Sequence, residues 1–119
     1  MKFLLLARVD EKKLEALSPD ESQQLHDDSL AYDDSLRKGG HLIAAQALHV
    51  SRDAAIVRVQ KGKATITDGP FVETKEQVGG FILLEARDRN QAIQLASQIP
   101  VARFGAIEVR EVKEMARSR

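Results

Sequence analysis

The chain has 119 residues, with 18 lysine and arginine residues against 18 aspartate and glutamate residues, no cysteine and a formal net charge of zero. This length predicts one compact domain that can bury a core without a disulfide or metal. The lack of cysteine excludes disulfides, thiolate metal sites and cysteine nucleophiles, and the balanced charge argues against a nucleic-acid partner. The apolar run at residues 3–7 is too short for a signal peptide or a membrane span, so we expect no membrane partner and a cytoplasmic location.

The first two predicted elements are a central strand and a long helix. Residues 2–9 are apolar at both strand parities, which is typical of a strand in the middle of a sheet. Ser18, Pro19 and Glu21 form a helix start with a capping box, and Gly39 ends the helix after Lys38. The apolar stripe of this helix is thin, and its many aspartates predict a solvated acidic face with acid–base pairs four residues apart, Asp33 with Arg37 and Asp34 with Lys38.

The remaining elements follow as strands, a hairpin and a second helix. Residues 41–48 predict a strand, residues 54–60 and 64–67 a hairpin with glycine at its tip, and residues 81–86 a second central strand after Gly79 and Gly80. Asp88 caps a helix that Pro100 stops, with Ala92, Ile93, Leu95, Ala96 and Ile99 as its buried stripe. A strand over 106–112 precedes a tail at about 113–119 that we expect to fray.

This order predicts an α+β, ferredoxin-like fold, a split βαβ arrangement with an extra hairpin, as a single domain over residues 1–119. Both helices cover one face of the sheet, and the other face stays open. Because the central strands are apolar on both faces, a monomer would expose a large apolar patch. We therefore expect a homodimer that covers the open face.

Residues 67–81 hold the most unusual local stretch, with Asp68, Gly69 and Pro70 forming a turn. Because Pro70 has no N–H, Asp68 must bond to the N–H of Phe71, to a side chain or to a ligand. Glu73, Lys75 and Glu76 follow closely, as in a polar site at a pocket mouth. A plain turn within a solvated loop explains the same residues, so both interpretations stay open.

The same stretch resembles the DGPF proteins of the YCII-related family. The similarity runs through residues 68–71, 73–76, 79–81, 100, 102–105 and 107–110, with residues 1–7 and 39–59 also fitting. It implies a dimeric α/β barrel in which two sheets pack face to face. Some members are encoded beside extracytoplasmic-function sigma factors, which implies a sigma-factor domain as a partner. More distant relatives have a His–Asp pair proposed as catalytic, and one branch removes chloride from a chlorinated aromatic ring.

The resemblance carries over to this chain only in part. The residues nearest to the His–Asp pair are His26 and Asp53, although an ungapped alignment from the second strand places Ser29 at the histidine position. A lone histidine among aspartates on a thinly apolar helix is more simply explained as a surface residue. Gln46 stands where relatives commonly have glutamate, so it cannot transfer protons and retains at most a role in orienting a ligand.

Other chemistries find no support in the sequence. His41 and His49 lie about 26 Å apart along one strand and cannot share a metal ion, and no zinc, nucleotide-binding or nucleophile-elbow motif is present. Arg103 is a candidate for binding a carboxylate or phosphate, with a structural salt bridge as the alternative.

Two functions are compatible with these residues. The first is a binding protein or accessory regulatory module, with a small aromatic or carboxylate ligand, or a sigma-factor domain, meeting a cleft around Asp68, Phe71, Glu73, Lys75, Glu76 and Arg103. The second is a small enzyme, a lyase or hydrolase without cofactor or metal, with His26, Asp53 or Asp68 as acid–base groups. A perturbed titratable pair in the cleft would favour the enzyme.

Overall fold

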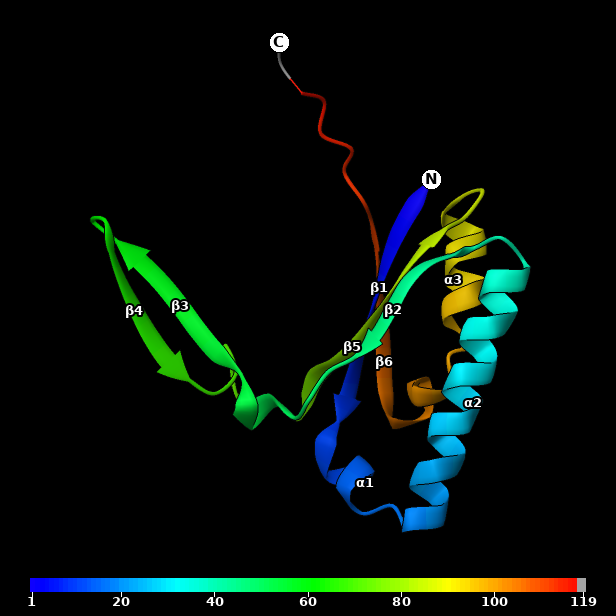
Figure 1. Ribbon diagram of the computed structural model, residues 1–119, viewed down its shortest axis with the longest axis horizontal. Helices are drawn as coiled ribbons and strands as arrows, with labels where there is room; N and C mark the ends of the chain where they lie inside the picture. Colours follow the sequence, from blue (N-terminus) through cyan, green and yellow to red (C-terminus); the bar gives the residue numbers. More distant parts are fainter. Residues whose placement is uncertain (118–119) are drawn as a thin grey trace.

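The computed structural model describes residues 1–117 of the chain as a four-stranded sheet covered on one face by helices, with a separate hairpin (Figure 1). In chain order the elements are β1 (Lys2–Asp10), α1 (Glu11–Glu15), α2 (Pro19–Lys38), β2 (Leu42–Ala47), the 3₁₀ helix η1 (Ser51–Asp53), β3 (Ala55–Gln60), β4 (Lys63–Asp68), β5 (Glu76–Glu85), α3 (Arg89–Ala96), the 3₁₀ helix η2 (Pro100–Phe104) and β6 (Gly105–Glu111).

The main sheet has the strand order β2-β5-β1-β6, and every neighbouring pair is antiparallel. The two inner strands, β1 and β5, are the two segments that carry apolar side chains on both faces of the strand. Figure 1 shows α2 and α3 together on one face of this sheet. The predicted α+β class and the ferredoxin-like strand order are therefore confirmed.

The hydrophobic core lies between the sheet and the two helices. Phe3, Leu5 and Leu84 are at most 1% exposed, and Leu36 of α2 packs against them. Alternate residues of the same strands, Leu4, Leu6, Phe81 and Leu83, pair across β1 and β5 on the opposite face and are only half-buried. The open apolar face predicted from the sequence is thus present, and its centre is formed by these four side chains.

The α2 helix begins as predicted. The Ser18 hydroxyl accepts a hydrogen bond from the Glu21 backbone N–H, and the Glu21 carboxylate accepts one from the Ser18 N–H. The shorter α1 was not predicted from the sequence. Its first turn is capped by the buried carboxylate of Asp10, which accepts hydrogen bonds from the N–H groups of Lys12 and Lys13. Five residues are too few to show helical periodicity.

Two predicted boundaries are wrong. β5 begins at Glu76 and passes through Gly79 and Gly80, which allow close packing, since a Cβ at Gly80 would lie 2.9 Å from the Gln46 carbonyl oxygen. α3 ends at Ala96 rather than near Pro100. Ile93 is 39% exposed, since it lies beside the stripe that buries Ala92 and Ala96.

The predicted hairpin forms, but it does not join the main sheet. β3 and β4 pair only with each other among the described residues, and Figure 1 shows them standing away from the body on the side opposite to α2 and α3. We call residues 55–68 the arm. Residues 112–117 have no regular secondary structure, and the rest of the predicted tail lies outside the described residues.

Candidate functional site

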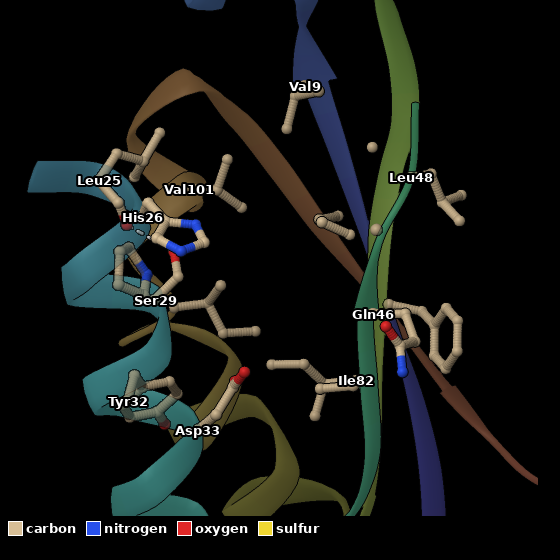
Figure 2. A pocket seen from close by; sticks show the side chains of 18 of the residues that line it. Val9, Leu25, His26, Ser29, Tyr32, Asp33, Gln46, Leu48, Ile82 and Val101 are labelled. Carbon is tan, nitrogen blue, oxygen red and sulfur yellow. Dashed lines mark hydrogen bonds between the residues drawn. The ribbon is translucent and has the colours of Figure 1, made fainter. Parts of the chain in front are cut away.

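A cleft of about 580 Å³ lies between α2 and the helix-covered face of the sheet. One wall comes from α2 and the other from β1, β2 and β5, while η2 contributes Pro100 and Val101. Figure 2 shows Val9 and Ile82 pointing from the sheet toward α2. Most of the lining side chains are aliphatic, so the polar groups in the cleft come mainly from one helix.

The polar wall is a line of α2 residues at helical spacing. His26, Ser29 and Asp33 follow one another at intervals of three and four residues, which places them on one face of the helix. Figure 2 shows the His26 imidazole and the Asp33 carboxylate pointing from α2 toward the sheet. His26 is exposed at the mouth, whereas Ser29 and Asp33 are half-buried. Thus three polar groups meet an apolar wall.

The environment of Asp33 changes its acidity. Partial burial raises the pKa of the Asp33 carboxyl, the positive charge of Arg37 lowers it, and the neighbouring Asp34 raises it. The predicted ion pair between Asp33 and Arg37 does not form, because Arg37 Nη1 pairs with Asp34 Oδ1 at 2.5 Å instead. Within residues 1–117, no hydrogen-bond partner satisfies the Asp33 carboxylate. Asp33 is therefore free to contact a bound molecule.

Two neighbouring hydroxyl groups have structural partners. Ser29 Oγ donates to the Leu25 carbonyl oxygen at 2.8 Å, which leaves only its lone pairs for a ligand. Tyr32 Oη donates to the Leu95 carbonyl oxygen at 2.6 Å and ties α2 to α3. Burial raises the pKa of the Tyr32 hydroxyl. The Tyr32 hydroxyl therefore supports the fold of the cleft rather than its chemistry.

Sequence reasoning placed Asp33 on a solvated acidic face and missed its position in the cleft. The signal was present in the helical spacing, because Leu25, Ser29 and Asp33 follow at intervals of four, and Tyr32 and Leu36 lie on the same side. The abundance of aspartates obscured that stripe.

The Asp68 turn belongs to a second, separate hollow of about 330 Å³ beside η1. Asp68 and Glu73 line it together with Glu11, whose carboxylate accepts hydrogen bonds from the N–H and hydroxyl of Ser51 at 2.7 and 2.5 Å. Gly69 adopts a φ of 104°, as the predicted turn requires. No hydrogen bond reaches the Asp68 carboxylate from residues 1–117.

The other residues predicted around Asp68 lie at several different places. Lys75 Nζ lies 3.9 Å from Asp10 Oδ2, and Phe71 is 71% exposed beneath the Arg58 guanidinium. Glu76 is the first residue of β5. Arg103 Nη2 lies 3.8 Å from Asp28 Oδ2 of α2, so the predicted structural salt bridge of Arg103 is present. The structure does not bring these residues into one cleft.

The residues suggested by the catalytic pair are also apart. His26 lines the α2 cleft, whereas Asp53 is an exposed residue of η1 and does not line it. Gln46 is among the residues that line the α2 cleft, although Figure 2 shows its side chain on the side of β2 away from α2. Over residues 1–117, no three acidic or histidine side chains form a group that could hold a metal ion, and none of the described helices is long and apolar enough to cross a membrane.

Comparisons with known proteins identify the family. An uncharacterised protein of Rhizobium meliloti (strain 1021) is 31% identical over 112 residues, covering 92% of this chain and 90% of the relative. Among solved structures, 5-chloro-2-hydroxyhydroquinone dehydrochlorinase from Burkholderia phenoliruptrix, in complex with 2,5-dihydroxybenzoquinone, is similar with a TM-score of 0.57 and 17% identity, covering 97% of this chain and 96% of that one. The model of the YCII-related domain matches residues 1–116. The chain therefore belongs to the YCII-related family.

Proposed function

We propose that this protein binds a small, ring-shaped organic molecule in the cleft between α2 and the sheet. The observation that carries this proposal is a mainly apolar cleft with His26, Ser29 and Asp33 in line on one wall. Its volume of about 580 Å³ lies within the usual range for ligand pockets, about 300–1,000 Å³. A flat ring would pack on the aliphatic sheet side, while its polar substituents meet α2.

The spacing of the polar groups indicates what kind of molecule fits. His26 and Asp33 are seven residues apart, which separates them by about 10 Å along the helix axis. They therefore cannot form a hydrogen-bonded His–Asp dyad by themselves. A molecule lying along α2 would meet the imidazole with one substituent and the carboxyl with another. An aromatic ring with hydroxyl groups on opposite sides has this pattern.

Acid–base catalysis in the same cleft is the second candidate function. It is favoured by the raised pKa of Asp33, because a raised pKa keeps more of the carboxyl in the protonated form that a general acid needs. His26 would then supply the base at the open end of the cleft. The similar fold of a dehydrochlorinase in complex with a dihydroxybenzoquinone supports the same class of ligand.

Binding is tested by NMR titration of the histidines with 2,5-dihydroxybenzoquinone and with hydroquinone, a ring that carries only two opposite hydroxyl groups. We expect the His26 signals to shift, while His41 and His49 do not respond. Ser29→Leu should reduce binding at least tenfold because it fills the polar wall, and Ser35→Leu on the exposed side of α2 is the matched control. Shifts confined to His41 or His49 would refute the assignment of the site.

Catalysis is tested separately by comparing chloride release from a chlorinated hydroxyhydroquinone by the wild type, His26→Gln and Asp33→Asn. A binding protein would release no chloride above the uncatalysed rate. An acid–base enzyme would lose turnover in both variants by a much larger factor than it loses ligand binding. These two outcomes separate the candidate functions.

The homodimer belongs to this proposal as well. The open face exposes an apolar centre of Leu4, Leu6, Phe81 and Leu83, beside an ion pair in which Arg8 Nε lies 2.7 Å from Glu108 Oε1. Two such faces packed together would form the dimeric barrel expected from the resemblance. Sedimentation equilibrium should give a dimer that Leu6→Glu dissociates, and a wild-type species of 13.2 kDa at micromolar concentration would contradict it. The sigma-factor partner finds no support in the comparisons and stays a prediction.

A further inference from the structure

The arm carries an apolar face that nothing in its own protomer covers. The cross-strand pairs Val57–Ile66 and Val59–Ala64 lie on one face, and the pairs Arg58–Thr65 and Gln60–Lys63 lie on the other. Val57, Val59 and Ile66 are 61%, 67% and 70% exposed. An isolated two-stranded hairpin is only marginally stable in water, so this face needs a partner surface.

The dimensions of the chain confirm that the arm stands apart. The radius of gyration is 16.4 Å, whereas a compact domain of this length has about 13.5 Å. Figure 1 shows the arm on the open-face side of the sheet, opposite to α2 and α3. The surface that the arm reaches is therefore the region that a second sheet would occupy in a face-to-face dimer.

The open sheet face is small for a stable interface. Four strands of six to ten residues cover about 19 by 27 Å, or about 500 Å². A standard interface buries about 800 Å² per partner. The two strands of the arm add about 200 Å², which favours a dimer in which sheet and arm are both engaged.

The arm's charge also fits another copy of this chain. The arm contains three basic residues, Arg58, Lys61 and Lys63, and one acidic residue, Asp68, which lies at its base away from the tip, while α2 carries six acidic and two basic residues. In a face-to-face dimer the partner's helix layer lies about 20 Å from the sheet of the first protomer, at about 10 Å per layer. A six-residue strand spans about 20 Å, so the basic tip of the arm reaches that depth.

From these observations we infer that the arm of each protomer embraces a second copy of this chain, with the Val57, Val59 and Ile66 face packed on the partner and the basic tip directed at the partner's acidic α2. This inference extends the proposed dimer and does not depend on the ligand. Because the contact is reciprocal, the dimer closes on itself rather than forming a chain of molecules.

Hydrogen exchange provides the direct test. In the dimer, the backbone amides of β3 and β4 should exchange at least tenfold more slowly than after dilution below the dimer dissociation constant, because an unsupported hairpin opens readily. Equal, fast exchange in dimer and monomer would overturn the inference.

Substitutions give a second test that also applies if the dimer never dissociates on dilution of the wild type. The variant Val57→Thr/Val59→Thr/Ile66→Thr keeps β-branched side chains but removes the apolar face, and it should raise the dimer dissociation constant at least tenfold. The matched control, Arg58→Lys/Thr65→Ser, alters the opposite face and should leave it unchanged. An unchanged dissociation constant in the triple variant would refute the role of the arm.

Two further variants distinguish the contribution of the arm's tip to the dimer from that of the sheet face. Lys61→Glu/Lys63→Glu should weaken the dimer and reduce its sensitivity to salt, because the contact with α2 is ionic. If Leu6→Glu dissociates the protein while the arm variants do not, the proposed sheet dimer stands and the arm inference fails. If the wild type is a monomer with an unprotected arm, both fail, and ligand binding in the cleft is still tested independently.

Discussion

Replacing Tyr32 by phenylalanine removes the hydroxyl that ties α2 to α3 beside the cleft. Tyr32 Oη donates to the Leu95 carbonyl oxygen at 2.6 Å from a half-buried position. Deleting a partner of a buried hydrogen bond costs about 1–3 kcal/mol when the remaining group is left unsatisfied. In Tyr32→Phe the Leu95 oxygen still accepts a hydrogen bond from the Gln98 backbone N–H at 3.3 Å. We therefore expect the free energy of unfolding to fall by about 1 kcal/mol, at the lower end of that range.

The measurement is urea unfolding at neutral pH, supported by thermal unfolding, in which about 1 kcal/mol corresponds to a fall in Tm of about 4 °C for a domain of this size. Tyr32 is the single tyrosine of the chain, which has no tryptophan, so the near-ultraviolet absorbance of tyrosinate reports on this residue alone. Burial raises the pKa of Tyr32 in the folded state. The folded protein should therefore ionise at a higher pH than the unfolded chain.

The sign of the pH effect follows from this shift. When the pKa of Tyr32 is higher in the folded than in the unfolded state, the shift stabilises the protein at pH values below the unfolded-state pKa, about 10. This stabilisation is lost as the pH rises through the folded-state pKa. The advantage of the wild type over Tyr32→Phe should thus shrink above about pH 10. Equal stability of the two proteins at neutral pH, together with tyrosinate formation at the ordinary pH, would refute the placement of Tyr32 between the helices.

Three further changes test the site and its framework. The raised pKa of Asp33 lowers the stability of the wild type as the pH rises above about 4, where the carboxyl of the unfolded chain ionises. Asp33→Asn should therefore flatten the pH dependence of the free energy of unfolding, measured in urea, between pH 3 and pH 6. An unchanged slope would contradict the partial burial of Asp33. Asp68→Asn should change the free energy of unfolding by less than about 0.5 kcal/mol, because the Asp68 side chain is exposed and has no partner among the described residues. A loss of about 1–3 kcal/mol in denaturant unfolding would show instead that the carboxylate supports the turn. Ser18→Ala should cost about 1 kcal/mol by removing the capping box, whereas Ser35→Ala on the exposed side of α2 should be neutral; equal thermal shifts would argue against the cap.

Much of the fold could be predicted because it depends on neighbours in sequence. The Ser18 cap, the two apolar parities of β1 and β5, and the glycine tip of the hairpin all reflect interactions within a few residues. The ferredoxin-like order followed from the order of these elements. The same local view failed at the end of α3 and at the start of β5, where pairing of residues 76–78 with Arg8, Val9 and Asp10 of β1 extends the strand.

The site was less predictable because it joins residues that are distant in sequence. The spacing of α2 was sufficient to place His26, Ser29 and Asp33 on one face, but only packing against the sheet made that face one wall of a cleft. Asp68 and Arg103 seemed to belong together, yet the tertiary structure places one beside η1 and the other against Asp28 of α2. Residue types and periodicity determine local conformation, whereas the distances between elements follow from burial of the core, and those distances decide which polar groups meet.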